Sequence, residues 1–127
     1  MEHRVTFQLL PEAASQARAV VSEGLGRSVS TKVLEDATLL VSELVTNAVR
    51  HAPPAGMPGI ELRLKIDPER VRVVVSDPGR GFVATPRLPT ASEGSGWGLY
   101  LVDRIADRWG VITNNRSEVW FEIDVEA

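Results

Sequence analysis

The chain has 127 residues, 43% of them hydrophobic and 24% charged, with a formal net charge of −3. This composition excludes a disordered chain, and the length predicts one domain over residues 1–127. The absence of cysteine excludes disulfides, zinc fingers and thiol nucleophiles. The sequence contains no run of 18 apolar residues, so no membrane span is expected, and the N-terminus lacks a signal-peptide core. Because no long run of one charge sign appears among the 14 basic and 17 acidic residues, we expect a cytoplasmic protein that binds a small molecule or another protein, not nucleic acid.

The first part of the chain predicts one strand and two helices. Apolar and polar residues alternate over residues 3–9, which indicates a half-buried strand. A helix is expected to begin at Pro11, and two glycines close it: Gly24 and Gly26. Ser30 is a suitable N-cap for a longer helix that runs to about His51, before a Pro/Gly-rich loop over 52–59.

The second part predicts two hairpins with a loop and a helix between them. The first hairpin pairs strands at 60–66 and 71–75 across a turn at 67–69. The other elements are a loop over 79–95, a helix over 97–106, and a final hairpin of strands 109–113 and 119–125 joined at Asn114-Asn115. The order βααββαββ favours an α+β fold: a two-layer α/β sandwich with a mixed, mostly antiparallel sheet and helices on one face.

The second predicted helix carries polar residues beside its apolar face. Glu43 and Asn47 are i, i+4 neighbours at the edge of that face, and Arg50 follows one turn later. A carboxylate can accept a proton, an amide oxygen suits Mg²⁺ and a guanidinium pairs with phosphate. The alternative is a solvated helix edge with a partial Glu–Arg pairing.

A carboxylate and glycines follow the first hairpin. Asp77 stands at the end of a strand, and Gly79, Gly81 and Phe82 come after it. Such a carboxylate can accept a hydrogen bond from an exocyclic amine such as that of adenine, and glycines let a flat ring approach the backbone. The alternative is a turn with aspartate as its first residue.

A glycine-rich segment opens the third predicted helix: Gly94, Ser95, Gly96, Trp97, Gly98 and Leu99. Backbone N–H groups at a helix start are unpaired and favour anions, so this segment predicts a phosphate cradle. It is not a Walker A loop, because no Gly-Lys-Ser/Thr follows, and its spacing does not fit the Rossmann fingerprint. The alternative is a flexible loop capped by Ser95.

Taken in this order, the three segments resemble the nucleotide-binding boxes of the GHKL ATPases, the superfamily of gyrase and the histidine kinases. Residues 40–51 resemble the N box, Asp77 to Phe82 the G1 box, and 94–99 the G2 box. The phrase Ser-Glu-Leu-Val-Thr-Asn-Ala at 42–48, with the short length, resembles the anti-sigma factor serine kinases of bacteria.

The resemblance implies a Bergerat-type sandwich that binds ATP with Mg²⁺. Asn47 would bind the metal, Glu43 would be the general base on a seryl hydroxyl, and Arg50 would lie near phosphate. Asp77 would accept from the adenine amino group. The remaining binding residues implied are Gly79, Gly81 and Phe82 near the base, and Gly94, Ser95, Gly96, Trp97, Gly98 and Leu99 around the phosphates. The loop over 83–93 would be the ATP lid.

The function implied is that of a serine/threonine protein kinase. It would transfer the γ-phosphate of ATP to a serine of a STAS-type anti-anti-sigma protein, and it would sequester a sigma factor. A homodimer is allowed, since related kinases are commonly dimers. The alternative is an ATP-binding regulatory interaction module without kinase activity, and a third hypothesis is a domain that no longer binds nucleotide.

Overall fold

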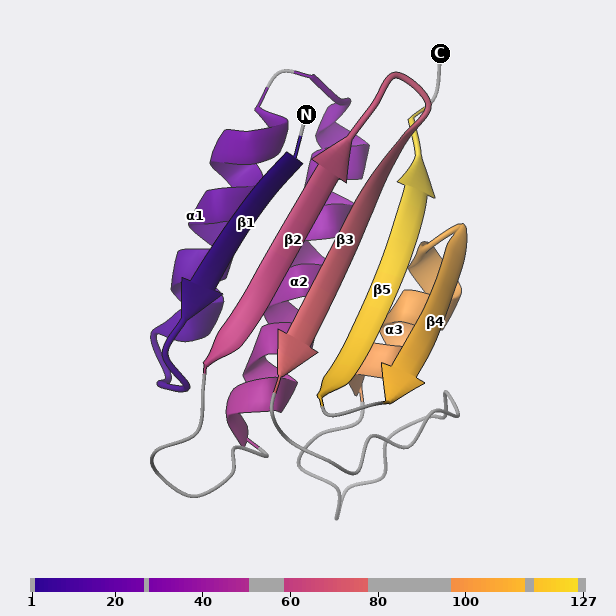
Figure 1. Cartoon of the computed structure of the whole chain (residues 1–127). Helices are drawn as coiled ribbons and strands as arrows, with labels where there is room; N and C mark the ends of the chain where they lie inside the picture. Colours follow the sequence, from indigo (N-terminus) through magenta and orange to yellow (C-terminus); the bar gives the residue numbers. More distant parts are fainter. Residues whose placement is uncertain (1, 27, 51–58, 78–96, 114–115, 126–127) are drawn as a thin grey trace.

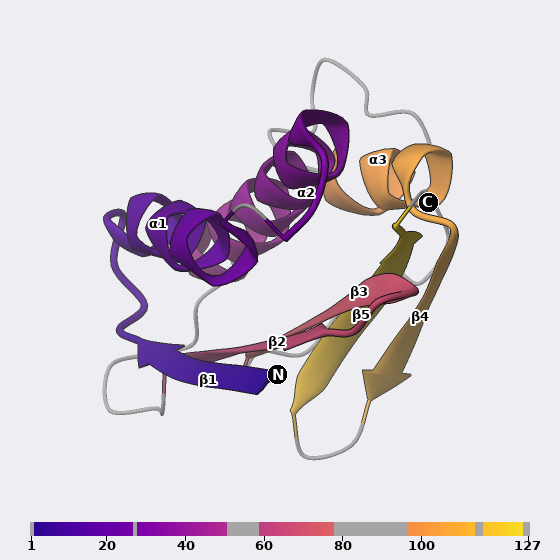
Figure 2. The ribbon, with the colours of Figure 1, turned by 90° about the horizontal axis from the view of Figure 1, so that it is seen from above.

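In the computed structural model, the described residues form a five-stranded sheet that carries three helices on one of its faces (Figures 1 and 2). The structure describes residues 2–26, 28–50, 59–77, 97–113 and 116–125. In chain order, the elements are β1 (Glu2–Phe7), α1 (Ala13–Leu25), α2 (Thr31–Arg50), β2 (Ile60–Ile66), β3 (Arg70–Asp77), α3 (Trp97–Ile105), β4 (Arg108–Thr113) and β5 (Ser117–Asp124). This is the predicted order βααββαββ.

The sheet has the strand order β1-β2-β3-β5-β4, and each described pair of neighbours is antiparallel. The α+β, two-layer prediction and the strand pairing of both predicted hairpins are confirmed. The turn predicted at Asn114-Asn115 and the loop predicted over 79–95 lie outside the described residues. Among the described strands, no parallel pair occurs. Helices α1 and α2 come between β1 and β2 in the chain, and α3 comes between β3 and β4. These three described helices lie on the same face of the sheet (Figure 2).

Helix α1 differs from the predicted helix at both ends. It begins at Ala13 instead of Pro11, and Gly24 lies inside its last turn instead of closing it. A Cβ at residue 24 would lie 2.7 Å from Leu64 Cδ2, so this glycine lets α1 approach β2 closely. Gly26 ends the helix with φ at 48°, and its N–H donates to the carbonyl of Ser22 at 2.9 Å.

Helix α2 begins where its sequence predicts. The backbone N–H of Val33 donates to Ser30 Oγ at 3.2 Å, which confirms Ser30 as the N-cap. The helix ends at Arg50 in the described chain, and the predicted end at His51 and the loop over 52–58 lie outside the described residues. Its buried face packs on the sheet and consists of Val33, Ala37, Leu40, Val41, Leu44, Val45 and Ala48.

The ends of several strands differ from the predicted ends, because hydrogen bonding to the neighbouring strand sets where each strand begins and ends. β1 stops at Phe7, because residues 8–10 turn and Leu10 N–H donates to the carbonyl of Gln8. β3 continues to Asp77 and β5 begins at Ser117, because these two residues still pair with each other. Every second side chain of the strands faces the helices, and the core lies between the two layers.

Candidate functional site

The C-terminal half of α2 presents the predicted polar edge. Glu43 and Asn47 are half-buried, whereas Arg50 at the last turn is exposed. The opposite edge of α2 faces α1, because Arg18 Nη1 donates to Ser42 Oγ at 2.8 Å. Since α2 lies between the other two helices (Figure 2), the edge with Glu43 and Asn47 lies on the side of α3. The pattern predicted from the sequence is therefore present in the fold.

Asn47 has an acceptor without a partner. Its Oδ1 is buried and has no hydrogen-bond donor in the part of the chain that the structure describes. Burying an amide oxygen without a donor costs free energy, so such an atom is typical of a ligand position. Mg²⁺ prefers oxygen ligands and takes few of them from the protein, with the rest from phosphate and water. The amide oxygen of Asn47 is therefore a suitable ligand for this metal.

Asp77 is the last residue of β3. Its position continues the alternation of Val73 and Val75, so its side chain is on the helical side, and it is only 4% exposed. Ser117, which is fully buried, is its direct partner in the register of β3 and β5. A carboxylate and a hydroxyl thus stand together at the end of two central strands.

Sequence reasoning missed Ser117. The final strand was expected to begin at residue 119, after the turn. The signal was present, because the inward alternation of Val119, Phe121 and Ile123 extends back to Ser117. Recognising it required the register of β5 against β3, which the sequence does not reveal.

The start of α3 is the third predicted segment. Trp97, Gly98 and Leu99 form its first turn, where backbone N–H groups have no acceptor within the helix. Leu99 is 8% exposed and belongs to the core, so its contribution to a site would come from its backbone. The side chain of Trp97 lies outside the described residues, as do six predicted site residues: Gly79, Gly81, Phe82, Gly94, Ser95 and Gly96.

The elements that carry these segments meet at one end of the molecule. In Figure 1, the C-terminal end of α2, the end of β3 and the start of α3 all lie at the lower end of the sandwich. The last turn of α2, the carboxylate of Asp77 and the first N–H groups of α3 are therefore at the same end. This arrangement can offer a base, an amide ligand and a carboxylate to one bound molecule.

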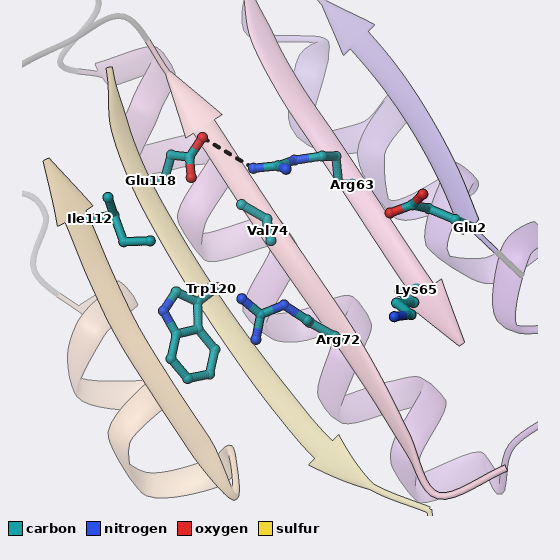
Figure 3. A pocket seen from close by; sticks show the side chains of 8 residues that line it. All are labelled: Glu2, Arg63, Lys65, Arg72, Val74, Ile112, Glu118 and Trp120. Atoms are coloured by element: carbon teal, nitrogen blue, oxygen red, sulfur yellow. Dashed lines mark hydrogen bonds and ion pairs between the residues drawn. The ribbon is translucent and has the colours of Figure 1, made fainter. Parts of the chain in front are cut away.

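A hollow lies on the other face of the sheet, which no described helix covers (Figure 3). Its volume is about 350 Å³, and its lining consists of Glu2, Arg63, Lys65, Arg72, Val74, Ile112, Glu118 and Trp120. Two of these residues form an ion pair, Arg63 Nη2 to Glu118 Oε2 at 3.1 Å (Figure 3). Because these side chains alternate with the inward residues, this hollow is separate from the polar end of the helical layer.

The described helices contain no segment with the length and apolar character that a bilayer crossing requires. Among the described residues, no group of three or more histidine or acidic side chains could hold a metal ion.

Comparison with known proteins places the chain in a family. Residues 7–123 match the family described as histidine kinase-like ATPase domain. No curated protein sequence matches the chain.

Two solved structures share its fold. The first, of the RsbU and RsbW domains of Rv1364c from Mycobacterium tuberculosis, has a TM-score of 0.78 and 19% identity. The match covers 98% of this chain and 32% of that one. The second is the histidine kinase domain of a blue-light activated histidine kinase from Erythrobacter litoralis EL346, with a TM-score of 0.60 and 24% identity. That match covers 94% of this chain and 64% of that one. The chain therefore spans less than two-thirds of the length of either solved chain.

The family match covers most of the chain, and the two solved structures share its layered fold. The chain belongs to the histidine kinase-like ATPase domain family of the GHKL superfamily, and this membership implies that it binds ATP.

Proposed function

We propose that this protein is an ATP-dependent serine/threonine protein kinase of the anti-sigma factor type. Its substrate would be a serine of a STAS-type anti-anti-sigma protein, and it would sequester a sigma factor in the cytoplasm. The observation that carries the proposal is the pair Glu43 and Asn47, one turn apart on the edge of α2 that is turned toward α3. The likeness to a chain with an RsbW domain supports the choice of partners.

In the proposed mechanism, the described site residues bind the nucleotide and its metal. Asp77 accepts a hydrogen bond from the adenine amine, and the first N–H groups of α3 bind phosphate oxygens. Asn47 Oδ1 is the protein ligand of Mg²⁺, which would neutralise phosphate charge when bound. Arg50, at the exposed end of α2, adds a positive charge on the phosphate side.

Glu43 is the proposed general base. It takes the proton of the seryl hydroxyl while the seryl oxygen bonds to the γ-phosphorus, and the bond from that phosphorus to the bridging oxygen of ADP breaks. Its half-buried position leaves one side open to a partner protein while the other side packs in the helical layer. The products are ADP and a phosphoserine on the partner.

The test uses labelled ATP and a purified STAS-type protein. We expect Glu43→Gln to lower the transfer rate by about 100-fold or more while ADP binding stays within about threefold of wild type. The matched control is Glu35→Gln, an exposed glutamate on the same helix, which should transfer at the wild-type rate. Transfer by Glu43→Gln at the wild-type rate would overturn the role of Glu43.

A second experiment, combined with the transfer assay, distinguishes the kinase from the alternative, an interaction module without kinase activity. Calorimetry with a sigma factor, with and without ATP, measures nucleotide-dependent docking. Docking without any labelled product from the wild-type protein would contradict the kinase proposal and favour the module.

A further inference from the structure

Arg116 lies just before β5 and joins the end of β3 to the residue that precedes β2. Its Nε donates to Ser76 Oγ at 2.8 Å, and its Nη2 donates to the carbonyl of Ser76 at 3.0 Å. The same Nη2 donates to the carbonyl of Gly59 at 2.7 Å. One guanidinium therefore binds three acceptors, on β3 and on the residue before β2.

These bonds lie where the pairing of β2 with β3 ends. The described register of the two strands stops at the pair Glu61 and Ser76, one residue before Asp77. Gly59 lies close against β1 on its other side, because a Cβ there would overlap the carbonyl oxygen of Phe7 at the end of that strand. Arg116 thus ties the last paired residue of β3 in this ladder to a residue that lies close against the end of β1.

The carbonyl that Arg116 holds belongs to the peptide group between Ser76 and Asp77. Ser76 faces the open side of the sheet and is 1% exposed, whereas the next side chain, Asp77, is on the helical side. Fixing this peptide plane restricts where the Asp77 carboxylate can lie, because only φ and the two side-chain dihedrals of that residue separate the two groups. A guanidinium suits this task, since its donors form a rigid planar fork.

We infer that Arg116 is a positioning residue for adenine recognition, acting through the Ser76–Asp77 peptide without contacting the nucleotide. This inference rests on the proposed role of Asp77 as the acceptor for the adenine amine. Its consequence concerns specificity: loss of Arg116 should weaken the discrimination between bases more than it weakens binding of the phosphates.

The test compares ADP with IDP, in which a keto oxygen replaces the adenine amine. Calorimetry in the presence of Mg²⁺ gives the Kd of each nucleotide. For the wild-type protein we expect ADP to bind about tenfold or more tightly than IDP, because a site built to accept from an N–H rejects the analogue without it. Arg116→Ala should bring this ratio to about 1–3, while the Kd for IDP changes by less than about threefold.

Arg116→Lys is the second variant, because the alanine variant removes three hydrogen bonds and its folding must be checked by circular dichroism. A lysine keeps the charge and part of the contact, so its ADP to IDP ratio should lie between those of wild type and alanine. The matched control is Arg72→Ala, which removes an arginine of β3 that pairs with Glu122 on the open face, far from Asp77 in register. It should keep the wild-type ratio.

The outcomes separate the inference from the proposed function. A folded Arg116 variant that keeps the wild-type ratio, or that weakens both nucleotides equally, overturns the inference. A wild-type protein that binds ADP and IDP equally overturns the proposed role of Asp77, and the inference falls with it. A ratio lost in Arg116→Ala, intermediate in Arg116→Lys and kept in Arg72→Ala supports both.

Discussion

Asn47 combines a folding cost with a proposed binding role. Its buried Oδ1 has no donor in the described chain, so the side chain contributes little to the stability of the ligand-free protein. We predict that Asn47→Ala changes the free energy of unfolding without ligand by less than about 1 kcal/mol. The same variant should lose the Mg²⁺-dependent part of ADP binding, measured by calorimetry with Mg²⁺ and with EDTA.

A neighbouring residue supplies the control for this prediction. Thr46 is half-buried on the same helix but lies away from the edge that carries Glu43 and Asn47. Thr46→Ala should keep the Mg²⁺ dependence of ADP binding. If Asn47→Ala kept it as well, the assignment of Asn47 as the metal ligand would be wrong.

Gly110 on β4 lies opposite Trp120 on β5, and the indole leaves no room for a side chain at residue 110. A Cβ at residue 110 would lie 2.7 Å from Trp120 Nε1 and 2.9 Å from Cε2, so the indole lies against the backbone of β4. Arg72 covers the same indole, with its Cζ 4.4 Å from the ring centroid (Figure 3). We predict that Gly110→Ala lowers the free energy of unfolding by about 1–3 kcal/mol, because Trp120 must leave this position.

A double-mutant cycle isolates the cause of that loss. In the Trp120→Ala background, Gly110→Ala should cost less than about 0.5 kcal/mol, because the overlapping side chain is gone. Urea unfolding monitored by circular dichroism measures both steps of the cycle. Equal costs in the two backgrounds would mean that the indole is not what requires glycine at residue 110.

At the scale of the elements, an ion network connects the last three strands of the sheet. Glu122 on β5 accepts from Arg108 Nε of β4 at 2.8 Å and from Arg72 Nη1 of β3 at 3.0 Å, and its side chain is only 14% exposed. The hydrogen bond from Arg108 is the main cause that holds the pKa of Glu122 below its usual value of 4.5. The network therefore joins an edge strand to the centre of the sheet.

This lowered pKa makes stability depend on pH with a definite sign. As the pH falls below about 4.5, the unfolded chain takes up the proton at Glu122 before the folded one does, so the network stabilises less. We predict that Glu122→Gln costs about 1 kcal/mol at pH 7 and less at pH 3. Urea unfolding at both pH values measures the difference. The control, Glu69→Gln in the exposed turn after β2, should show no such change, and a cost for Glu122→Gln that grows toward acid pH would contradict the prediction.

Strands and helices were predictable where one periodic pattern decides them. The alternation over 60–66 and the apolar stripe of α2 each match the structure, because one face of each element packs in the core. Gly24 and Ser117 were misjudged because their roles depend on a distant element: Gly24 on Leu64, and Ser117 on its register with Asp77. The clamp of Arg116 on Ser76 and Gly59 was hidden for the same reason, since a separation of 40 residues or more leaves no local pattern.

At the scale of the whole molecule, the candidate site depends on both layers. The sheet contributes Asp77 at the end of β3, and the helical layer contributes the last turns of α2 and the first turn of α3. A ligand that contacts all three elements binds the folded chain and not the unfolded one. Binding must therefore raise the stability of the whole domain by mass action.

We predict a large thermal shift with ATP and Mg²⁺. At a concentration 100 times the Kd, a ligand that binds only the folded state adds about 2.7 kcal/mol to the free energy of unfolding. For a domain of this size that corresponds to a rise in Tm of roughly 10 °C. Differential scanning fluorimetry measures it, and the rise should continue with the logarithm of the ATP concentration and shrink in Asp77→Asn. A Tm that stays constant up to millimolar ATP with Mg²⁺ would instead identify a member of the family that no longer binds nucleotide.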